Sequence, residues 1–128
     1  MSTTAAMHIP TMIVDDQADI RLLMRLLIDR ANEGLVVVAE AANGQEAIDQ
    51  AEHVDPLVIV LDQMMPEMNG VETAARLRAT RPTQVIVLCT AYLDDEVIAH
   101  AKRVGVTHCI SKETVQQLPD LIRQAVGA

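Results

Sequence analysis

The fold is decided by residues 56–70, which read PLVIVLDQMMPEMNG. The first six are apolar without interruption, and a short run of this kind predicts a strand that is buried on both faces. Asp62 follows the run directly, and the proline and glycine after it are typical of a loop. In an open parallel α/β sheet, reactive groups lie beyond the carboxyl ends of the strands. Asp62 is therefore the first candidate for a functional residue.

Strand-like and helix-like patterns alternate along the rest of the chain. Short apolar runs predict four further strands, at residues 9–14, 35–40, 84–89 and 106–110. Apolar residues at helical spacing predict helices over residues 18–30, 45–52, 71–80 and 94–104. Pro119 cannot lie inside a helix without the loss of a hydrogen bond, so we expect a loose turn over residues 113–117 and a last helix that begins near Leu118.

These elements form five strand-then-helix units with short connections. Parallel strands need right-handed crossovers, and the helices supply them. The expected fold class is therefore α/β, a doubly wound five-stranded parallel sheet with strand order 2-1-3-4-5, the flavodoxin-like arrangement. We expect residues 8–128 to form this one domain and residues 1–7 to be a disordered N-terminal extension.

The composition excludes several classes of function. Half of the 128 residues are hydrophobic, and the absence of Phe and Trp leaves an aliphatic core. The formal net charge of -8 argues against direct nucleic-acid binding and against an anionic membrane surface. The sequence shows neither a signal peptide nor an apolar run of about 18 residues, so a cytoplasmic protein is expected. Cys89 and Cys109 fall in predicted strands and are expected to be reduced core thiols.

Functional side chains follow four of the five predicted strands. They are Asp15 and Asp16 after the first strand, Asp62 after the third, Thr90 after the fourth and Lys112 after the fifth. Because the carboxyl ends of parallel strands meet at one edge of the sheet, these side chains should lie together. Crowded carboxylates raise one another's pKa unless a cation neutralises them. A site that is rich in carboxylate oxygens and lacks a Cys/His cluster suits Mg²⁺.

Such a site is suited to phosphoryl chemistry. Mg²⁺ and Lys112 would screen the oxygens of a phosphoryl group, and Thr90 would donate a hydrogen bond to it. Asp62 would be the nucleophile, because a carboxyl with a reference pKa of about 3.9 is ionised at neutral pH without an activating base. Asp62, Thr90 and Lys112 thus form the candidate catalytic set. The resulting aspartyl phosphate is labile, which suits a signal that must decay.

The strand-end motifs occur together in one known family. They are D-x-x-M-P-x-x-N-G at residues 62–70, Asp15-Asp16, Thr90-Ala91 and Lys112. Together they resemble the receiver domain of bacterial two-component response regulators, over essentially the whole chain. The resemblance implies the CheY-like version of the fold expected above.

The resemblance also implies roles for the acidic residues. Asp62 would accept a phosphoryl group from the phosphohistidine of a sensor histidine kinase or a phosphotransfer protein. Asp16 and Asp62 would bind Mg²⁺ together with the backbone carbonyl of Met64, and Asp15 would assist through water. The chain would catalyse only its own phosphorylation and dephosphorylation and would not be an enzyme for a free substrate.

The resemblance further implies an output. Residues 38–44, VAEAANG, and residues 90–96, TAYLDDE, are similar to the NarL/LuxR class, in which a DNA-binding domain usually follows. Phosphorylation would change the face formed by the fourth helix, the fifth strand and the fifth helix. That change would control an output domain or a target protein, with a dimer on activation, and would control transcription where a DNA-binding domain follows.

Three residues depart from the family pattern or modify it. Cys109 stands where the family has an aromatic switch residue, so the usual inward rotation of a Tyr or Phe cannot occur. Glu113 replaces the common proline after Lys112. Tyr92 should overhang the site and slow the access of water. We assign Tyr92 and Cys109, together with Thr90, to the conformational switch and to the control of water access to the site.

Three other functions fit parts of the pattern. A pseudo-receiver that serves as a phosphorylation-independent interaction module is the main alternative, because Cys109 alters the switch. A flavodoxin-like cofactor binder shares the strand order, but the acidic loop after the first strand would repel an FMN phosphate. A phosphatase with an aspartyl nucleophile is a weak alternative, because such an enzyme normally carries that residue after the first strand, with a second Asp two positions on.

Overall fold

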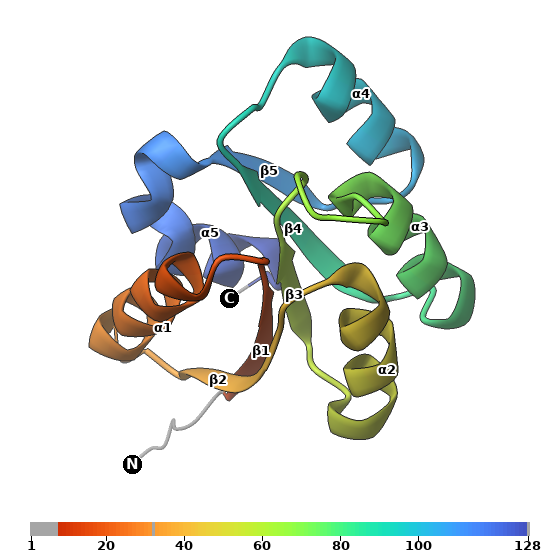
Figure 1. The fold of residues 1–128 in the computed structure, drawn as a ribbon. Coiled ribbons are helices and arrows are strands. Elements are labelled where there is room, and N and C mark those ends of the chain that lie inside the picture. Colours follow the sequence, from red (N-terminus) through yellow and green to blue (C-terminus); the bar gives the residue numbers. More distant parts are fainter. Residues whose placement is uncertain (1–7, 32, 128) are drawn as a thin grey trace.

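Five strands and six helical segments alternate along the chain in the computed structural model, which describes residues 8–31 and 33–127 (Figure 1). The strands are β1 (Ile9–Val14), β2 (Leu35–Ala41), β3 (Val58–Leu61), β4 (Val85–Thr90) and β5 (His108–Ser111). The helices are α1 (Ala18–Ala31), α2 (Gly44–Val54), α3 (Gly70–Thr80), α4 (Asp95–Arg103), the 3-10 helix η1 (Lys112–Gln117) and α5 (Leu118–Ala125). The extension predicted for residues 1–7 lies outside the described residues. None of the helices within 8–31 and 33–127 is long and apolar enough to cross a membrane.

The strands form one parallel sheet in the order β2-β1-β3-β4-β5, which confirms the predicted doubly wound fold. Helices α1 and α5 cover one face, and α2, α3 and α4 cover the other (Figure 1). Strand β3 lies in the middle of the sheet, and all four of its residues are fully buried. The chain is therefore held from both faces up to the point where Asp62 leaves the sheet.

The core is aliphatic, as the composition predicts, and it is divided in two by the sheet. On β1, Met12 and Val14 pack with α2, α3 and α4, whereas Ile9 and Ile13 pack with α1 and α5. This alternation is the two-residue period of a strand. Burial of one such side chain contributes roughly 1.5–3 kcal/mol, so both faces of β1 resist any shift of the strand that ends at the acidic residues.

A bulge interrupts β2, which is an edge strand. The register of β1 against β2 shifts after Val37, so that Val38 is one extra residue on β2. An extra residue moves the following side chains to the opposite faces of the sheet. Leu35 packs on the α1 and α5 face, but Ala41 packs on the α2 and α3 face, and Glu40 turns toward α1. The sequence predicted a strand here but not the bulge.

Some element ends differ from the prediction, and hydrogen bonds explain the differences. Helix α2 begins at Gly44, because the side chain of Asn43 accepts a hydrogen bond from the Glu46 N–H at 2.9 Å and caps the helix. Strand β5 begins two residues late, because the Val106 N–H donates to a carbonyl of α4. The turn and helix predicted at the C-terminus are confirmed, with Pro119 in the first turn of α5.

Replacement of Gly70 by alanine should destabilise the fold without removing a functional group. A Cβ at this position would lie 2.4 Å from the backbone oxygen of Asp62 and 2.9 Å from the Cα of Gln63. We expect the free energy of unfolding to fall by roughly 1–3 kcal/mol, the usual cost of overpacking. Urea unfolding followed by circular dichroism measures the loss. Arg76→Ala, at an exposed position of the same helix, should remain near wild type; an equally stable Gly70→Ala protein would contradict the close approach.

Candidate functional site

The loops that follow β1, β3, β4 and β5 surround one pocket of about 300 Å³, called here the acidic pocket. It is lined by Asp16, Gln17, Ile20, Asp62, Met64, Thr90, Ala91, Tyr92 and Lys112. Asp15 is fully buried and reaches the pocket through an ion pair with Lys112. The structure therefore brings together the strand-end residues predicted from four separate segments of the chain.

Lys112 joins two buried carboxylates. Its Nζ lies 2.8 Å from Asp15 Oδ2 and 3.2 Å from Asp62 Oδ2. Asp15 has no exposed surface, and Asp62 is only 4% exposed. Buried charges are costly without a partner, so the shared ammonium is needed to hold the two carboxylates this close together.

The electrostatics of the pocket favour a second cation. Burial raises the pKa of Asp62 above its ordinary value, and the charge of Asp15 raises it further, while Lys112 and the nearby N–H of Met64 offset only part of the rise. Burial lowers the pKa of Lys112, but its hydrogen bond to Asp15 and the two carboxylate charges outweigh that effect, so the pKa is raised. Lys112 is thus firmly protonated, yet its charge does not fully compensate the ionised Asp62.

The donor atoms fit a hard divalent cation. One carboxylate oxygen from each of Asp15, Asp16 and Asp62 lies within 4.8 Å of the other two. Asp62 Oδ1 is buried and has no hydrogen-bond partner among the described residues. A buried carboxylate oxygen without a partner, beside an exposed aspartate and in an all-oxygen set, matches the ligands that Mg²⁺ prefers. Met64 lines the same pocket, and the role of its backbone carbonyl stays a prediction.

Part of the signature at residues 62–70 builds the loop that presents Asp62. The Gly70 N–H donates to the Gln63 carbonyl at 3.0 Å, and the Val71 N–H donates to Gln63 Oε1 at 2.9 Å. Asn69 and Glu72 form a capping box at the start of α3, each side chain accepting from the other's backbone N–H. The Asn-Gly pair therefore begins α3 and folds the loop against the end of β3.

Thr90 and Tyr92 lie on another wall of the acidic pocket. Thr90 is fully buried, and its hydroxyl accepts a hydrogen bond from the Tyr92 N–H at 3.3 Å. A hydroxyl that accepts through its oxygen keeps its own proton for donation, so Thr90 can still donate toward the pocket. Tyr92 lines the same pocket and is 69% exposed.

Cys109 is separated from these residues. It lines two other pockets, each of which also contains Leu93, beside β5. Both cysteines are free among the described residues, Cys89 buried and Cys109 partly buried. Burial raises the pKa of Cys89 to about 12 and also raises the pKa of Cys109. Of the residues assigned to switching and access, Thr90 and Tyr92 thus share the acidic pocket and Cys109 does not.

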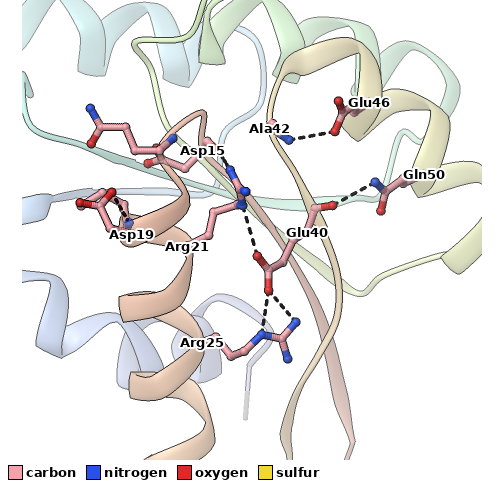
Figure 2. Close-up of polar contacts among 10 residues, drawn as sticks. Asp15, Asp19, Arg21, Arg25, Glu40, Ala42, Glu46 and Gln50 are labelled. Carbon is pink, nitrogen blue, oxygen red and sulfur yellow. Dashed lines mark hydrogen bonds and ion pairs between the residues drawn. The ribbon is translucent and has the colours of Figure 1, made fainter.

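Sequence reasoning missed several residues of the site. Gln17 lines the pocket, and its N–H donates to Asp15 Oδ1 at 2.9 Å. This is the bond of an Asx-turn, which an aspartate at the end of a strand could have indicated. Ile20 also lines the pocket. Arg21 of α1 does not line the pocket, but it donates to the Asp15 carbonyl at 2.7 Å (Figure 2).

Known proteins are similar to this chain in sequence and in fold. The family described as "Response regulator receiver domain" matches residues 11–123. The chain is 32% identical over 101 residues to the chemotaxis protein CheY of Thermotoga maritima, and the match covers 79% of this chain and 82% of that protein. It is also 32% identical over 103 residues to the transcriptional regulatory protein YdfI of Bacillus subtilis, where the match covers 80% of this chain but only 47% of YdfI.

A solved structure agrees with the sequence matches. The response regulator domain of Thermotoga maritima CheB has a TM-score of 0.85 and 26% identity, with 94% of this chain and 98% of that chain covered. The family match extends over nearly all of the described chain, including the residues that surround the acidic pocket. The chain therefore belongs to the receiver domains of two-component response regulators.

Proposed function

We propose that this receiver domain accepts a phosphoryl group on Asp62 with the help of Mg²⁺ and changes conformation in response. The main support for the proposal is that the two oxygens of the Asp62 carboxylate differ in their contacts. Lys112 holds Oδ2 at 3.2 Å, whereas the buried Oδ1 has no hydrogen-bond partner among the described residues. A carboxylate that is oriented through one oxygen keeps the other available for a phosphorus atom or a cation.

Each polar residue of the acidic pocket would have a separate role in phosphoryl transfer. One oxygen of the ionised Asp62 attacks the phosphorus of a phosphohistidine, the P–N bond breaks, and the departing imidazole keeps the electron pair. The ammonium of Lys112 and the hydroxyl of Thr90 stabilise the oxygens of the phosphoryl group. Water then attacks the phosphorus, inorganic phosphate leaves, and the Asp62 carboxylate is restored. The chain would catalyse only its own phosphorylation and dephosphorylation and would turn over no free substrate.

Four residues are proposed to serve the cation. Asp16, Asp62 and the backbone carbonyl of Met64 would hold Mg²⁺, and Asp15 would assist through water. When bound, Mg²⁺ would neutralise the negative charge that the phosphoryl oxygens bring into a pocket already rich in carboxylates. The three clustered carboxylates and the partnerless Asp62 Oδ1 support this assignment.

The partners follow from the family and remain proposals for this chain. The donor would be a sensor histidine kinase or a phosphotransfer protein, and the receiver of the signal an output domain or a target protein, with dimerisation on activation. Because one relative is a transcriptional regulator more than twice as long as the match, control of transcription is one such output. The free thiols of the described residues suit the cytoplasm as the compartment.

Phosphorylation of Asp62 can be tested directly by intact-protein mass spectrometry. The purified chain is incubated with acetyl phosphate and Mg²⁺, and we expect the mass of one phosphoryl group to be added as an acid-labile adduct. Asp62→Ala should gain none, and omission of Mg²⁺ should suppress the gain. Asp29→Asn, at an exposed position of α1, should behave as wild type. A wild-type chain that gains no phosphoryl group would leave the phosphorylation-independent interaction module as the better reading.

The raised pKa of Asp62 predicts a pH-dependent effect on stability. In the absence of divalent cations, ionisation of Asp62 costs the folded protein more than the unfolded chain, because the pKa lies above its ordinary value of 3.8 in the fold. Asp62→Asn should therefore raise the melting temperature at pH 7. The gain should shrink as the pH falls through the raised pKa, and vanish below 3.8, where both states are protonated. Thermal unfolding from pH 3 to 8 tests this, and a lower melting temperature at pH 7 would refute it.

The exposed ring of Tyr92 should lengthen the life of the phosphorylated state. Tyr92 lines the acidic pocket and is largely exposed, so its ring would limit the approach of water to a phosphoryl group on Asp62. Tyr92→Ala should lose phosphate faster after removal of the phosphodonor, measured as decay of the acid-labile adduct. Tyr92→Phe keeps the ring and should decay at the wild-type rate; an unchanged rate in Tyr92→Ala would show that the ring does not shield the site.

A further inference from the structure

A chain of hydrogen bonds links the first acidic loop to the edge of the sheet. Arg21 donates from one terminal nitrogen to the Asp15 carbonyl at 2.7 Å and from Nε to Glu40 Oε1 at 3.2 Å (Figure 2). Arg25, one turn later on α1, donates to Glu40 Oε2 at 2.7 Å. The two arginines share the same carboxylate, but only Arg21 bonds the Asp15 carbonyl.

The position of Glu40 depends on the bulge in β2. Because Val38 is an extra residue, Glu40 lies on the face of the sheet that α1 covers, opposite both arginines. Its backbone carbonyl accepts a hydrogen bond from Gln50 of α2 at 2.9 Å. Glu40 is therefore held through its backbone on one side of the sheet, while its carboxylate orients Arg21 on the other.

The link is shielded from water more than an ordinary surface ion pair. The side chains of Arg21 and Glu40 are 19% and 30% exposed, and that of Arg25 is 38% exposed. Exposed ion pairs contribute little, whereas charge-assisted hydrogen bonds in partly buried positions are considerably stronger. Arg21 is the more buried of the two arginines, and its planar guanidinium can serve two acceptors at once.

The Asp15 carbonyl belongs to the peptide unit that joins Asp15 to Asp16. Asp15 is also fixed through its N–H, which donates to the Ala41 carbonyl at 3.1 Å, and through its carboxylate, which pairs with Lys112. Asp16, by contrast, is exposed, and one of its carboxylate oxygens lies within 4.8 Å of oxygens of Asp15 and Asp62. The direction of the Asp16 side chain depends on the orientation of the peptide that precedes it, and the carbonyl of that peptide accepts the hydrogen bond from Arg21.

We propose that Arg21, oriented by Glu40, is a positioning residue that holds the Asp15–Asp16 peptide so that the Asp16 carboxylate faces the cation site. The inference rests on the proposed function, because it concerns the same Mg²⁺ site. It adds a residue that touches neither the cation nor the phosphoryl group.

Electrostatics alone predicts the opposite effect, which makes the proposal testable. Arg21 is a cation near a site for cations, so loss of its charge should strengthen Mg²⁺ binding if charge were its main contribution. Loss of its hydrogen bond to the Asp15 carbonyl should weaken binding, because Asp16 would then occupy its productive orientation only part of the time. The sign of the change distinguishes the two roles.

The test measures Mg²⁺ affinity by titration calorimetry on the full, unphosphorylated chain. Arg21→Gln should bind Mg²⁺ more weakly than wild type by roughly fivefold, which corresponds to the loss of about one net hydrogen bond. Arg25→Gln is the matched control, because it removes the same charge from the same helix and the same partner without touching Asp15. It should bind Mg²⁺ as wild type does or slightly more tightly.

A second variant separates geometry from folding and from charge. Arg21→Lys keeps the charge but cannot serve both acceptors with a planar fork, so its Mg²⁺ affinity should also fall, to a level between wild type and Arg21→Gln. Thermal unfolding verifies that each variant is folded. If Arg21→Gln does not fold, the Mg²⁺ affinity of Arg21→Lys tests the positioning role. If the variants at Arg21 bind as tightly as Arg25→Gln while wild type binds Mg²⁺, the positioning role is wrong and the proposed function stands. If wild type binds no Mg²⁺, both are wrong.

Discussion

The ion pairs of Lys112 with Asp15 and Asp62 are the interaction on which the acidic pocket depends. Two carboxylates buried at the ends of adjacent strands repel each other strongly, and the single ammonium between them offsets that repulsion. The compensation is incomplete, because the pKa of Asp62 remains raised. The resting pocket therefore has unfavourable electrostatics that a cation relieves, and this links the stability of the domain to occupancy of its site.

The sheet makes this arrangement possible. Strands β1 and β3 are neighbours, and helices cover both faces of the sheet, so their carboxyl ends bring Asp15 and Asp62 together at one edge. Lys112 comes from the far end of the sequence, directly after β5, and reaches across β4 to the two carboxylates. A displacement of β5 would therefore move Lys112 relative to Asp62, and a change at Asp62 would act on β5 through the same ion pair.

Most of the fold and most of the side chains that gather at the acidic pocket could be predicted from the sequence. Each strand is a short apolar run, and four of the five runs are followed by a carboxylate, hydroxyl or ammonium side chain. The predicted strand order then placed Asp62 beside Asp15. The sequence did not predict which residues of β2 face which side of the sheet. Val and Ala in the run 35–41 suit either face, so the pattern gives no sign of the extra residue. Arg21 was missed for the same reason, since its partner Glu40 points toward α1 only after the bulge.

The bulge at Val38 has a further consequence for the edge of the sheet. Within residues 8–31 and 33–127, no strand pairs with the outer side of β2, and Val36 and Val38 of this strand are 40% and 39% exposed. A regular apolar edge strand is a template on which another chain can add a strand and begin aggregation. The extra residue breaks the repeat of backbone donors and acceptors along this edge. The irregularity that turns Glu40 toward α1 therefore also protects the protein against self-association through its edge strand.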